Sequence, residues 1–255
     1  IIKTLFANGY RNWKYNTNDH PSSFIGVIVA SVWKNGKRII DTSMRHVPKP
    51  KKGLRLLDVG CGSSDFLLRA KSMGWDVTGV DFDINAVKAA QKKGINVRYG
   101  GIEILDTKEE KFDYITMAHI LEHVHEPVDF LQRSYDLLNK GGKLWIDTPN
   151  ITSQGSKIYG KHWRGFEIPR HLVMFSHKSI EDLLRKIGFK SFYYPPYRKL
   201  CKSLFNASHA IANSIDPYSD GAQNFNLSKI IKKSEKIALK DISEREFITI
   251  VAQKN

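Results

Sequence analysis

The chain has 255 residues, of which 41% are hydrophobic and 26% are charged, and its formal net charge is +14. This composition excludes a disordered chain, and the length suits one large α/β domain. The best candidate for a membrane span, Phe24 to Val32, is far shorter than the roughly 18 apolar residues that a spanning helix needs. The positive charge favours an anionic partner, although lysines scattered over a solvated surface explain it equally well.

The two cysteines, Cys61 and Cys201, lie far apart in the sequence, and Cys61 stands between two glycines. A structural disulfide is therefore not expected, and a reducing cytoplasm is the predicted environment. Because the chain begins with Ile1 and not with Met, its start carries no information about a signal peptide.

Residues 1–53 are predicted to form an N-terminal helical cap. They carry the aromatic residues Tyr10, Trp13 and Tyr15, and then a helical segment from about Phe24 to Met44. A linker rich in proline and lysine follows this segment and separates the cap from the first strand.

In residues 54–255, apolar runs rich in β-branched side chains alternate with amphipathic stretches, which is typical of βαβ units around a parallel sheet. The predicted strands are Leu54–Val59, Trp75–Val80, Ile95–Tyr99, Phe112–Met117, Gly142–Asp147, Phe189–Tyr194 and Glu246–Ala252. The predicted helices are Asp65–Met73, Ile84–Lys93, Pro127–Asn139 and one from Ser176 to Ile187, each followed within two residues by a glycine. Asp83 and Ser176 are the predicted N-caps of the second and the fourth.

Two segments interrupt this alternation, and both are predicted to be lids over a binding site. Residues 197–244 insert two helices before the last strand, and residues 149–175 are longer than a connection requires. The segment 149–175 holds the expected acceptor-binding residues, which are His162, Trp163, Arg164 and Arg170. The two arginines can clamp a phosphate or carboxylate, or they can brace the lid through salt bridges.

The glycine loop after the first strand selects the ligand. Gly60 and Gly62 let a ligand approach the backbone closely, and Asp81, about 20 residues on, suits a ribose diol. A dinucleotide site would have glycine at the position of Asp65, where a carboxylate repels phosphates. S-adenosylmethionine (SAM) carries a ribose and a sulfonium cation but no phosphate, so the carboxylates of Asp58 and Asp65 favour it.

Four motifs carry a resemblance to a known family. They are LDVGCG (57–62), GVD (79–81), FDYI (112–115) and LEHV (121–124). In this order and spacing they resemble class I SAM-dependent methyltransferases, in particular the branch with quinone-biosynthesis and surface-glycan or small-molecule O-methyltransferases. The resemblance implies a Rossmann-like α/β fold with a doubly wound seven-stranded sheet, mostly parallel with an antiparallel last strand.

The resemblance also implies the cofactor contacts. Gly60, Cys61 and Gly62 would line the methionine end and the ribose, Asp81 would accept the ribose hydroxyls, and Phe82 would pack on adenine. Further implied contacts with SAM are Asp58, Gly101, Ile102, Ala118 and His119. Gly101 and Ile102 replace an acidic or polar residue that the family usually has near the adenine amine, and Ser64 replaces a frequent glycine.

Methyl transfer is an in-line displacement that needs no covalent residue, but a hydroxyl acceptor benefits from a general base. His171 is the first candidate for this base, and His119 and His123 are the others. His119, Glu122 and His123 share one helical face, which is similar to the Glu-x-x-Glu-His metal site of related quinone methyltransferases. Because a histidine replaces the first glutamate, Mg²⁺ is disfavoured, which leaves a softer metal or none, and the prediction is that no metal binds here.

The expected acceptor is a hydroxyl of a small molecule or saccharide, with a nucleotide- or lipid-linked sugar favoured by the arginine pair. A basic segment, Leu227 to Lys240, has apolar residues at helical spacing and is predicted either to touch the anionic inner face of a membrane or to face the core. Two alternatives are a tRNA or rRNA methyltransferase, although no RNA-binding module is evident, and a SAM-binding protein without catalysis.

Overall fold

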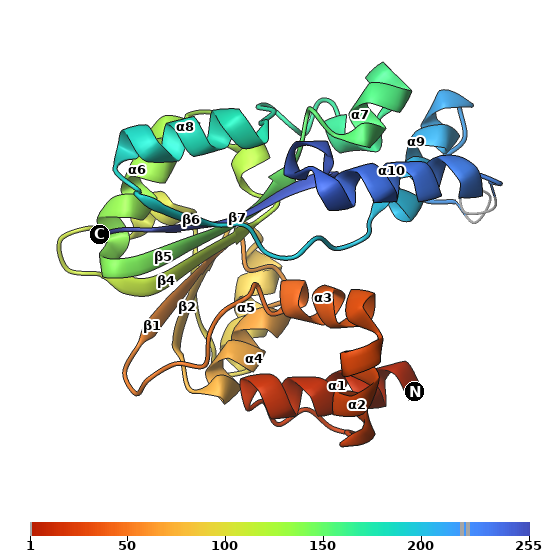
Figure 1. Ribbon diagram of the computed structural model, residues 1–255. Helices are drawn as coiled ribbons and strands as arrows, with labels where there is room; N and C mark the ends of the chain where they lie inside the picture. The colour runs from red at the N-terminus through yellow and green to blue at the C-terminus, as the bar shows by residue number, and fades with distance from the viewer. Residues whose placement is uncertain (1, 220–221, 223–224) are drawn as a thin grey trace.

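The computed structural model describes residues 2–219, 222 and 225–255 (Figure 1). Seven strands form one sheet in the order β3-β2-β1-β4-β5-β7-β6, and β7 alone runs antiparallel to its neighbours. The strands are β1 (Arg55–Val59), β2 (Asp76–Asp81), β3 (Asn96–Tyr99), β4 (Phe112–Ala118), β5 (Leu138–Pro149), β6 (Ser191–Tyr193) and β7 (Phe247–Gln253). The predicted seven-stranded, doubly wound α/β fold is therefore confirmed.

Helices cover both faces of the sheet (Figure 1). One face carries α4 (Asp65–Met73) and α5 (Ile84–Lys92), and the other carries α6 (Pro127–Leu137) and α8 (His177–Ile187). Asp83 caps α5 by accepting hydrogen bonds from two backbone N–H groups, and Ser176 forms a capping box at the start of α8. The predicted N-caps are thus the observed ones.

The boundary between α6 and β5 differs from the prediction. The helix predicted to continue to Asn139 ends at Leu137, and the next strand begins at Leu138 instead of Gly142. Leu138 is buried and pairs with Phe112 of β4, so a contact distant in sequence draws it out of the helix. Gly141, expected to end the helix, instead has a φ of +78° inside β5, where the β4–β5 register is irregular.

The N-terminal residues form three helices, α1 (Ile2–Tyr15), α2 (Ile25–Val32) and α3 (Lys34–Ser43). The single helical segment predicted from Phe24 to Met44 is interrupted at Trp33, whose φ and ψ of −90° and 69° are not helical. The indole of Trp33 folds over Gly36, a position where any side chain would collide with the ring. This packing explains the break.

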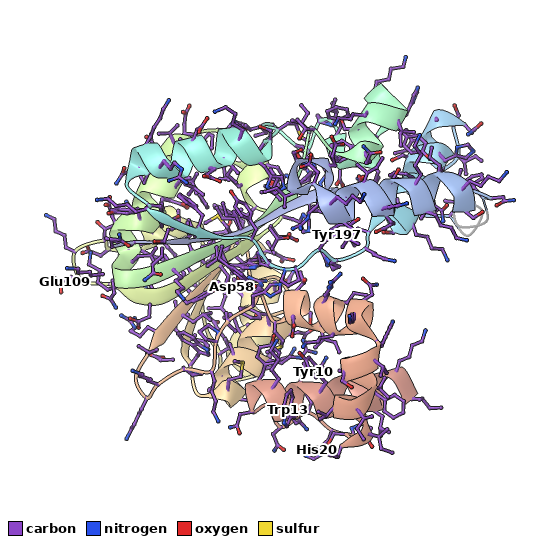
Figure 2. The ribbon with its side chains drawn as sticks, viewed as in Figure 1. Tyr10, Trp13, His20, Asp58, Glu109 and Tyr197 are labelled. Atoms are coloured by element: carbon purple, nitrogen blue, oxygen red, sulfur yellow. The ribbon has the colours of Figure 1, made fainter. Side chains whose placement is uncertain are left out.

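The cap shares a core with the sheet. Tyr10 and Tyr15 are buried and donate hydrogen bonds of 3.0 and 2.7 Å to the buried carboxylate of Asp41. The same apolar cluster includes Met44 and, from α4, Phe66. Figure 2 shows Tyr10 inside the cap, between α1 and α3, where it meets Asp41. The domain boundary at residue 53 stays a prediction.

The remaining helices lie beyond the carboxyl edge of the parallel strands, across from the cap (Figure 1). They are α7 (Gln154–Tyr159), α9 (Cys201–Ala212) and α10 (Ser228–Lys240). Elsewhere among the described residues, short 3₁₀ helices connect the elements, namely η1 (Ile102–Ile104), η2 (Leu121–His123), η3 (Gly160–His162), η4 (Arg164–Phe166) and η6 (Ile242–Glu244). Within the described residues, no helix is long and apolar enough to cross a bilayer.

The segment Leu227 to Lys240 forms α10 almost throughout, and its apolar side turns inward. Leu227, Ile230, Ile231 and Ile237 are half-buried, and Ser234, Glu235 and Ala238 are buried, while the lysines are exposed. This arrangement matches the predicted alternative of a helix with one side toward the core and the other exposed to solvent.

Candidate active site

The glycine loop connects β1 to α4 at the carboxyl edge of the sheet. Gly60 and Gly62 have φ values of +69° and +49°, which favour glycine. Asp81, at the end of β2, accepts hydrogen bonds from the backbone N–H of Gly62 at 2.7 Å and of Asp83 at 2.8 Å. Its carboxylate therefore fixes the loop and still has lone pairs for a ligand.

Ser64, the substitute for the frequent glycine, has a φ of +62° and a buried side chain. Ser64 directly precedes α4, but its hydroxyl makes no capping bond. The left-handed backbone is what favours glycine here, and serine adopts it at a cost of about 1 kcal/mol or more.

Asp58 lies fully buried beneath this loop (Figure 2). It forms an ion pair with Arg45 from the cap and accepts a hydrogen bond of 2.9 Å from Thr116. Arg45 also stacks over the ring of Phe66, with 4.3 Å from the guanidinium to the ring centre. Burial lowers the pKa of Arg45 to about 9. Sequence reasoning missed Arg45, because it stands in an irregular segment outside every motif.

Phe82 and Gly101 meet on the far side of the loop. The Phe82 side chain is 69% exposed, and a side chain at Gly101 would collide with its ring. Glu103, two residues after Gly101, accepts a hydrogen bond of 2.8 Å from the Gly101 backbone. The structure thus brings a carboxylate to the region where the sequence lacks an acidic residue at positions 101 and 102.

A cavity of about 450 Å³ lies between the end of β4, the lid and α9. It brings together five predicted site residues, which are His119, His123, Arg164, Arg170 and His171. Two other predicted site residues do not meet the acceptor there. His162 does not line this cavity, and Trp163 is buried and donates a hydrogen bond of 3.1 Å from its indole N–H to Glu246. Trp163 thus packs within the lid.

His119 directly follows β4 and has a φ of +55°, which is uncommon for a residue other than glycine. Its Nδ1 lies 3.3 Å from Glu122 Oε1, and its Nε2 lies 3.7 Å from Asp147 Oδ2. Burial opposes the charged imidazolium, but the hydrogen bond to Glu122 and the charge of Asp147 outweigh it and raise the pKa of His119. This histidine therefore favours its protonated form.

His171 and His123 have a different environment. Nδ1 of His171 lies 2.7 Å from the Gly165 carbonyl, and Nδ1 of His123 lies 2.8 Å from the Arg170 carbonyl. Each Nδ1 must donate to these acceptors, so each Nε2 is free to accept a proton. Burial lowers the pKa of His171, whose Nε2 lies 3.6 Å from Glu167.

The two arginines of the cavity share one carboxylate. Glu167 accepts from Arg164 at 2.8 Å and from Arg170 at 2.7 Å, and this pairing lowers the pKa of Glu167. The Arg164 side chain is mostly buried, whereas that of Arg170 is 69% exposed. The group combines two fixed positive charges with one negative charge, so its net charge is positive.

A profile of the methyltransferase-domain family matches residues 33–192, which is more than half of the chain. The chain belongs to this methyltransferase family. The match begins at Trp33, just before α3, and ends within β6, and it includes the glycine loop, Asp81 and all three histidines of the cavity.

Similarity to individual proteins is partial. The methyltransferase is 34% identical to the mitochondrial ubiquinone biosynthesis O-methyltransferase of Rattus norvegicus over 125 residues, which cover 45% of this chain and 36% of the rat protein. It is 29% identical to an uncharacterised protein of Methanocaldococcus jannaschii over 155 residues, 61% of this chain and 72% of that protein. The match therefore spans little more than a third of the rat enzyme.

Solved structures share the fold. A SAM-dependent methyltransferase of Archaeoglobus fulgidus is 20% identical, covers 91% of this chain and 100% of its own, and has a TM-score of 0.58. Phosphoethanolamine N-methyltransferase 2 of Haemonchus contortus, in complex with SAM, is 17% identical, covers 97% and 60%, and has a TM-score of 0.54. The predicted class I methyltransferase and its cofactor, SAM, are confirmed.

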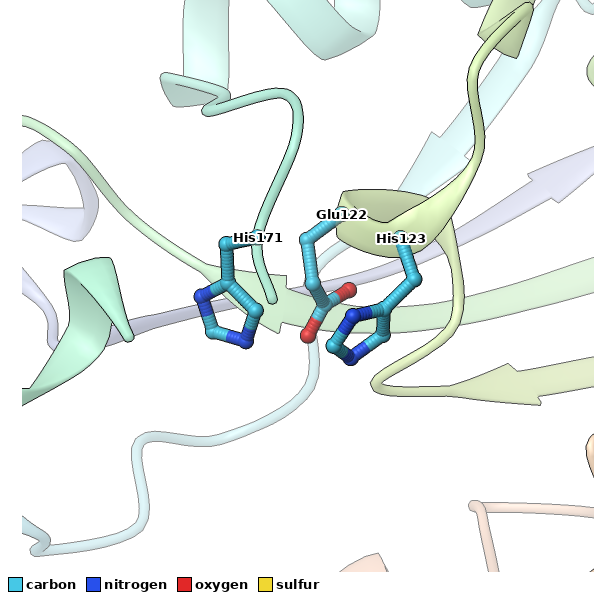
Figure 3. A group of neighbouring side chains, drawn as sticks. All are labelled: Glu122, His123 and His171. Carbon is cyan, nitrogen blue, oxygen red and sulfur yellow. The ribbon is translucent and has the colours of Figure 1, made fainter. Parts of the chain in front are cut away.

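One group in the methyltransferase has the spacing of a metal site, but it differs from the predicted set. Ligand atoms of Glu122, His123 and His171 lie within 4.8 Å of one another (Figure 3), and His171 takes the place expected for His119. Glu122 is fully buried, and its oxygens already face Thr148 at 2.9 Å and His119 at 3.3 Å. Protein hydrogen bonds thus occupy the carboxylate that such a metal would need.

Proposed function

We propose that this methyltransferase transfers the methyl group of SAM to a hydroxyl of a small molecule or saccharide that also carries an anionic group. The cavity beside the end of β4 carries this proposal, because histidines and an arginine pair line the same space. A nucleotide-linked or lipid-linked sugar has both features, a hydroxyl and a phosphate. The partial similarity to ubiquinone O-methyltransferases supports oxygen as the methylated atom.

The cofactor would lie across the carboxyl edge of β1, β2 and β4. In this proposal Gly60, Cys61 and Gly62 contact the methionine part and the ribose through the backbone, and Asp81 accepts the two ribose hydroxyls. The remaining contacts are Phe82 on the adenine face, Gly101, Ile102 and Glu103 beside the adenine, and Ala118 and His119 near the methionyl group. Asp58 would act through Arg45, which its ion pair holds beneath the loop.

The reacting hydroxyl would lie between the methyl group and His171. The sulfonium supplies an activated methyl group, so the protein has to orient the two reactants and remove a proton. Nε2 of His171 would accept the hydroxyl proton while the oxygen forms its bond to the methyl carbon and the carbon–sulfur bond breaks. Glu167, at 3.6 Å, would stabilise the resulting imidazolium.

Two features favour His171 as the base over its neighbours. Burial keeps its imidazole neutral at neutral pH, and the Gly165 carbonyl fixes the tautomer with a free Nε2. His119 is held between two carboxylates that raise its pKa, so it is less often in the neutral form that a base needs than His171 is. His123 shares the favourable tautomer and lies with its ring 4.8 Å from that of His171, so it is the second candidate.

The anionic group would bind at Arg164 and Arg170. Both guanidinium groups already hold one carboxylate, that of Glu167, in the geometry that a phosphate group would use. A phosphate that displaces Glu167 would keep these interactions and add negative charge where two positive charges lie. An acceptor that lacks the anionic group would leave the Glu167 pairing intact and bind more weakly.

The experiment follows methyl transfer from labelled SAM to hydroxyl acceptors with and without a phosphate group, using wild type, His171→Ala and the control His162→Ala. We expect His171→Ala to lose about a hundredfold or more in turnover while it binds SAM normally, because a positioned base contributes that much. His162 lies outside the cavity, so His162→Ala should remain active.

Three results would contradict the proposal. If His171→Ala retains turnover but loses thermal stability, the residue braces the lid. If phosphorylated and unphosphorylated acceptors react equally well, the arginine pair has no role in binding. If bulk RNA accepts the methyl group and hydroxyl acceptors do not, the alternative RNA methyltransferase replaces this function.

A further inference from the structure

The helix α2 presents an apolar face to solvent. Ile25, Ile28 and Val32 recur at the spacing of one helix side and are 55%, 59% and 77% exposed. Phe24, just before the helix, is 73% exposed, and Trp33, just after it, is 49% exposed. Single exposed apolar residues are ordinary, but three on one side of a short helix, with one more at each end, mark an interaction surface.

This face is open because α2 packs against α1 with its opposite side. Gly26 and Ala30 are buried there, and a side chain at Gly26 would overlap with the backbone of Phe6 in α1. The two helices thus approach closely through small residues, which leaves the large aliphatic side chains pointing outward. Surface helices usually carry polar residues on their outer side, and α2 differs from them in this respect.

The N-terminal segment that carries this face has a large positive charge. Residues 1–54 contain ten basic and two acidic residues, so they carry more than half of the net charge of the chain. Both acidic groups are paired, Asp19 with Arg11 at 2.6 Å and Asp41 with Lys14 at 2.7 Å. Lys3, Lys34 and Lys37, which lie near the ends of α1 and α2, are exposed.

We propose that the outer face of α2 docks this protein on a membrane surface that contains anionic lipids. Aromatic and aliphatic side chains would enter the boundary between headgroups and acyl chains, and the lysines would contact the lipid phosphates. A second copy of the chain is a poorer occupant, because joining two caps through this face would bring two sets of excess positive charge together. The membrane supplies the complementary charge.

This surface differs from the segment that the sequence suggested for membrane contact. The apolar side of α10 is half-buried in the fold, and Leu239 is its one residue among the large exposed hydrophobic side chains. A bilayer therefore has little apolar surface to bind on α10. On α2 the apolar side chains are already free, so docking requires no rearrangement.

A direct connection links this face to the acceptor cavity. Immediately after α2, Asn35 of α3 accepts a hydrogen bond of 3.1 Å from the Lys199 backbone, and Arg38 donates one of 3.0 Å to the Tyr197 carbonyl. Lys199 leads into α9, which lines the cavity through Ser203 and two further residues. If the proposed function holds, docking would place the cavity of the enzyme near lipid-linked acceptors. This last step rests on the proposed function, whereas docking itself does not.

The test is sedimentation of the chain with vesicles of phosphatidylcholine alone and of phosphatidylcholine mixed with phosphatidylglycerol. We expect binding to the mixed vesicles, weakened by added salt because the lysines contact charged headgroups. Replacing Ile28 and Val32 together by serine should weaken binding about tenfold or more, since each removes apolar surface from the bilayer. Replacing Lys34 and Lys37 by glutamine should abolish the preference for anionic lipid.

Leu239→Ser is the matched control, because it removes an exposed leucine from α10, and it should bind as wild type does. The proposal fails if wild type ignores the mixed vesicles, or if Leu239→Ser loses binding and the α2 variant does not. It also fails if light scattering finds a dimer that the Ile28 and Val32 changes dissociate, since α2 then joins two copies. Methyl transfer to water-soluble acceptors should be equal in all these variants, so a failed proposed function would appear separately.

Discussion

The cofactor loop and the lid both bury charged groups, but they neutralise them differently. Beneath the loop, Asp58 is fully buried and faces the guanidinium of Arg45. Against the lid, Glu246, which directly precedes β7, is equally buried but accepts hydrogen bonds from neutral donors of the lid, the Gly155 N–H at 2.8 Å and the Trp163 indole at 3.1 Å. Burial raises the pKa of Glu246 to about 7, as expected for a carboxyl group without a cation.

Under the proposed function, this difference separates the region that would bind the cofactor from the region that would select the acceptor. Around the loop, the buried charges are paired and Asp81 holds the backbone of Gly62, so the proposed cofactor site is rigid. The acceptor side uses histidines, shared carboxylates and buried titratable groups, whose charge depends on pH and on the bound molecule. The predictions below test each side of this comparison.

The largest effect is expected at Asp81. In Asp81→Asn, the side chain loses its charge and one of the two oxygens proposed to accept the ribose hydroxyls. We expect the affinity for S-adenosylhomocysteine to fall about a hundredfold or more, because two charge-assisted hydrogen bonds weaken. Calorimetry measures this directly.

Asp83→Asn provides the control, because Asp83 is also acidic and adjacent but serves as the N-cap of α5. That change should leave the affinity nearly unaltered, since asparagine is an equally good N-cap. Equal binding by the Asp81 variant and wild type would mean that the rigid site does not recognise the ribose.

A smaller effect, on stability, is expected where the lid meets α8. His177 is 6% exposed, and neither ring nitrogen has a hydrogen-bond partner within the described residues. Burial and then the charge of Arg245 lower its pKa to about 4 from an ordinary value of 6.5. The unfolded chain therefore binds a proton more readily than the folded chain between these values, and stability falls as the pH falls from 6.5 toward 4.

From this group alone, wild type should lose about 2 kcal/mol of unfolding free energy between pH 7 and pH 5, and His177→Phe should not. Urea unfolding of both proteins at the two pH values gives the difference between them. In that difference the contributions of other groups, such as Glu246, cancel. His125→Phe, at an exposed position, is the control. If wild type and His177→Phe lose the same unfolding free energy between pH 7 and pH 5, folding does not lower the pKa of His177.

Most of the sheet could be predicted from sequence because its signals are local. Apolar runs, N-caps and glycines identify each strand and helix within a few residues, and the N-caps Asp83 and Ser176 are the observed ones. The errors arise where a distant contact decides the backbone. Leu138 leaves its helix to pair with Phe112, and Trp33 interrupts a helix by folding over Gly36.

The candidate site divides in the same way. The glycine loop and Asp81 stand at the ends of adjacent parallel strands, so their proximity follows from the topology. Arg45 belongs to no motif, and its contact with Asp58 depends on how the cap packs. Trp163 was expected at the acceptor, but its partner Glu246 lies 83 positions later, and no local pattern reveals such a pair.

The smallest effect concerns the carboxylate that the arginines share. Glu167→Gln keeps the shape of the side chain but removes the negative charge that now occupies Arg164 and Arg170. If these arginines receive an anionic group, pyrophosphate should bind about three- to tenfold more tightly to the variant, because partly exposed ion pairs contribute about 1 kcal/mol. Glu244→Gln, which removes a carboxylate paired with Lys157 outside the cavity, should leave pyrophosphate affinity unchanged. Weaker binding by Glu167→Gln would instead mean that Glu167 orients the guanidinium groups for the anion, while equal binding by both variants would exclude the arginine pair as the anion site.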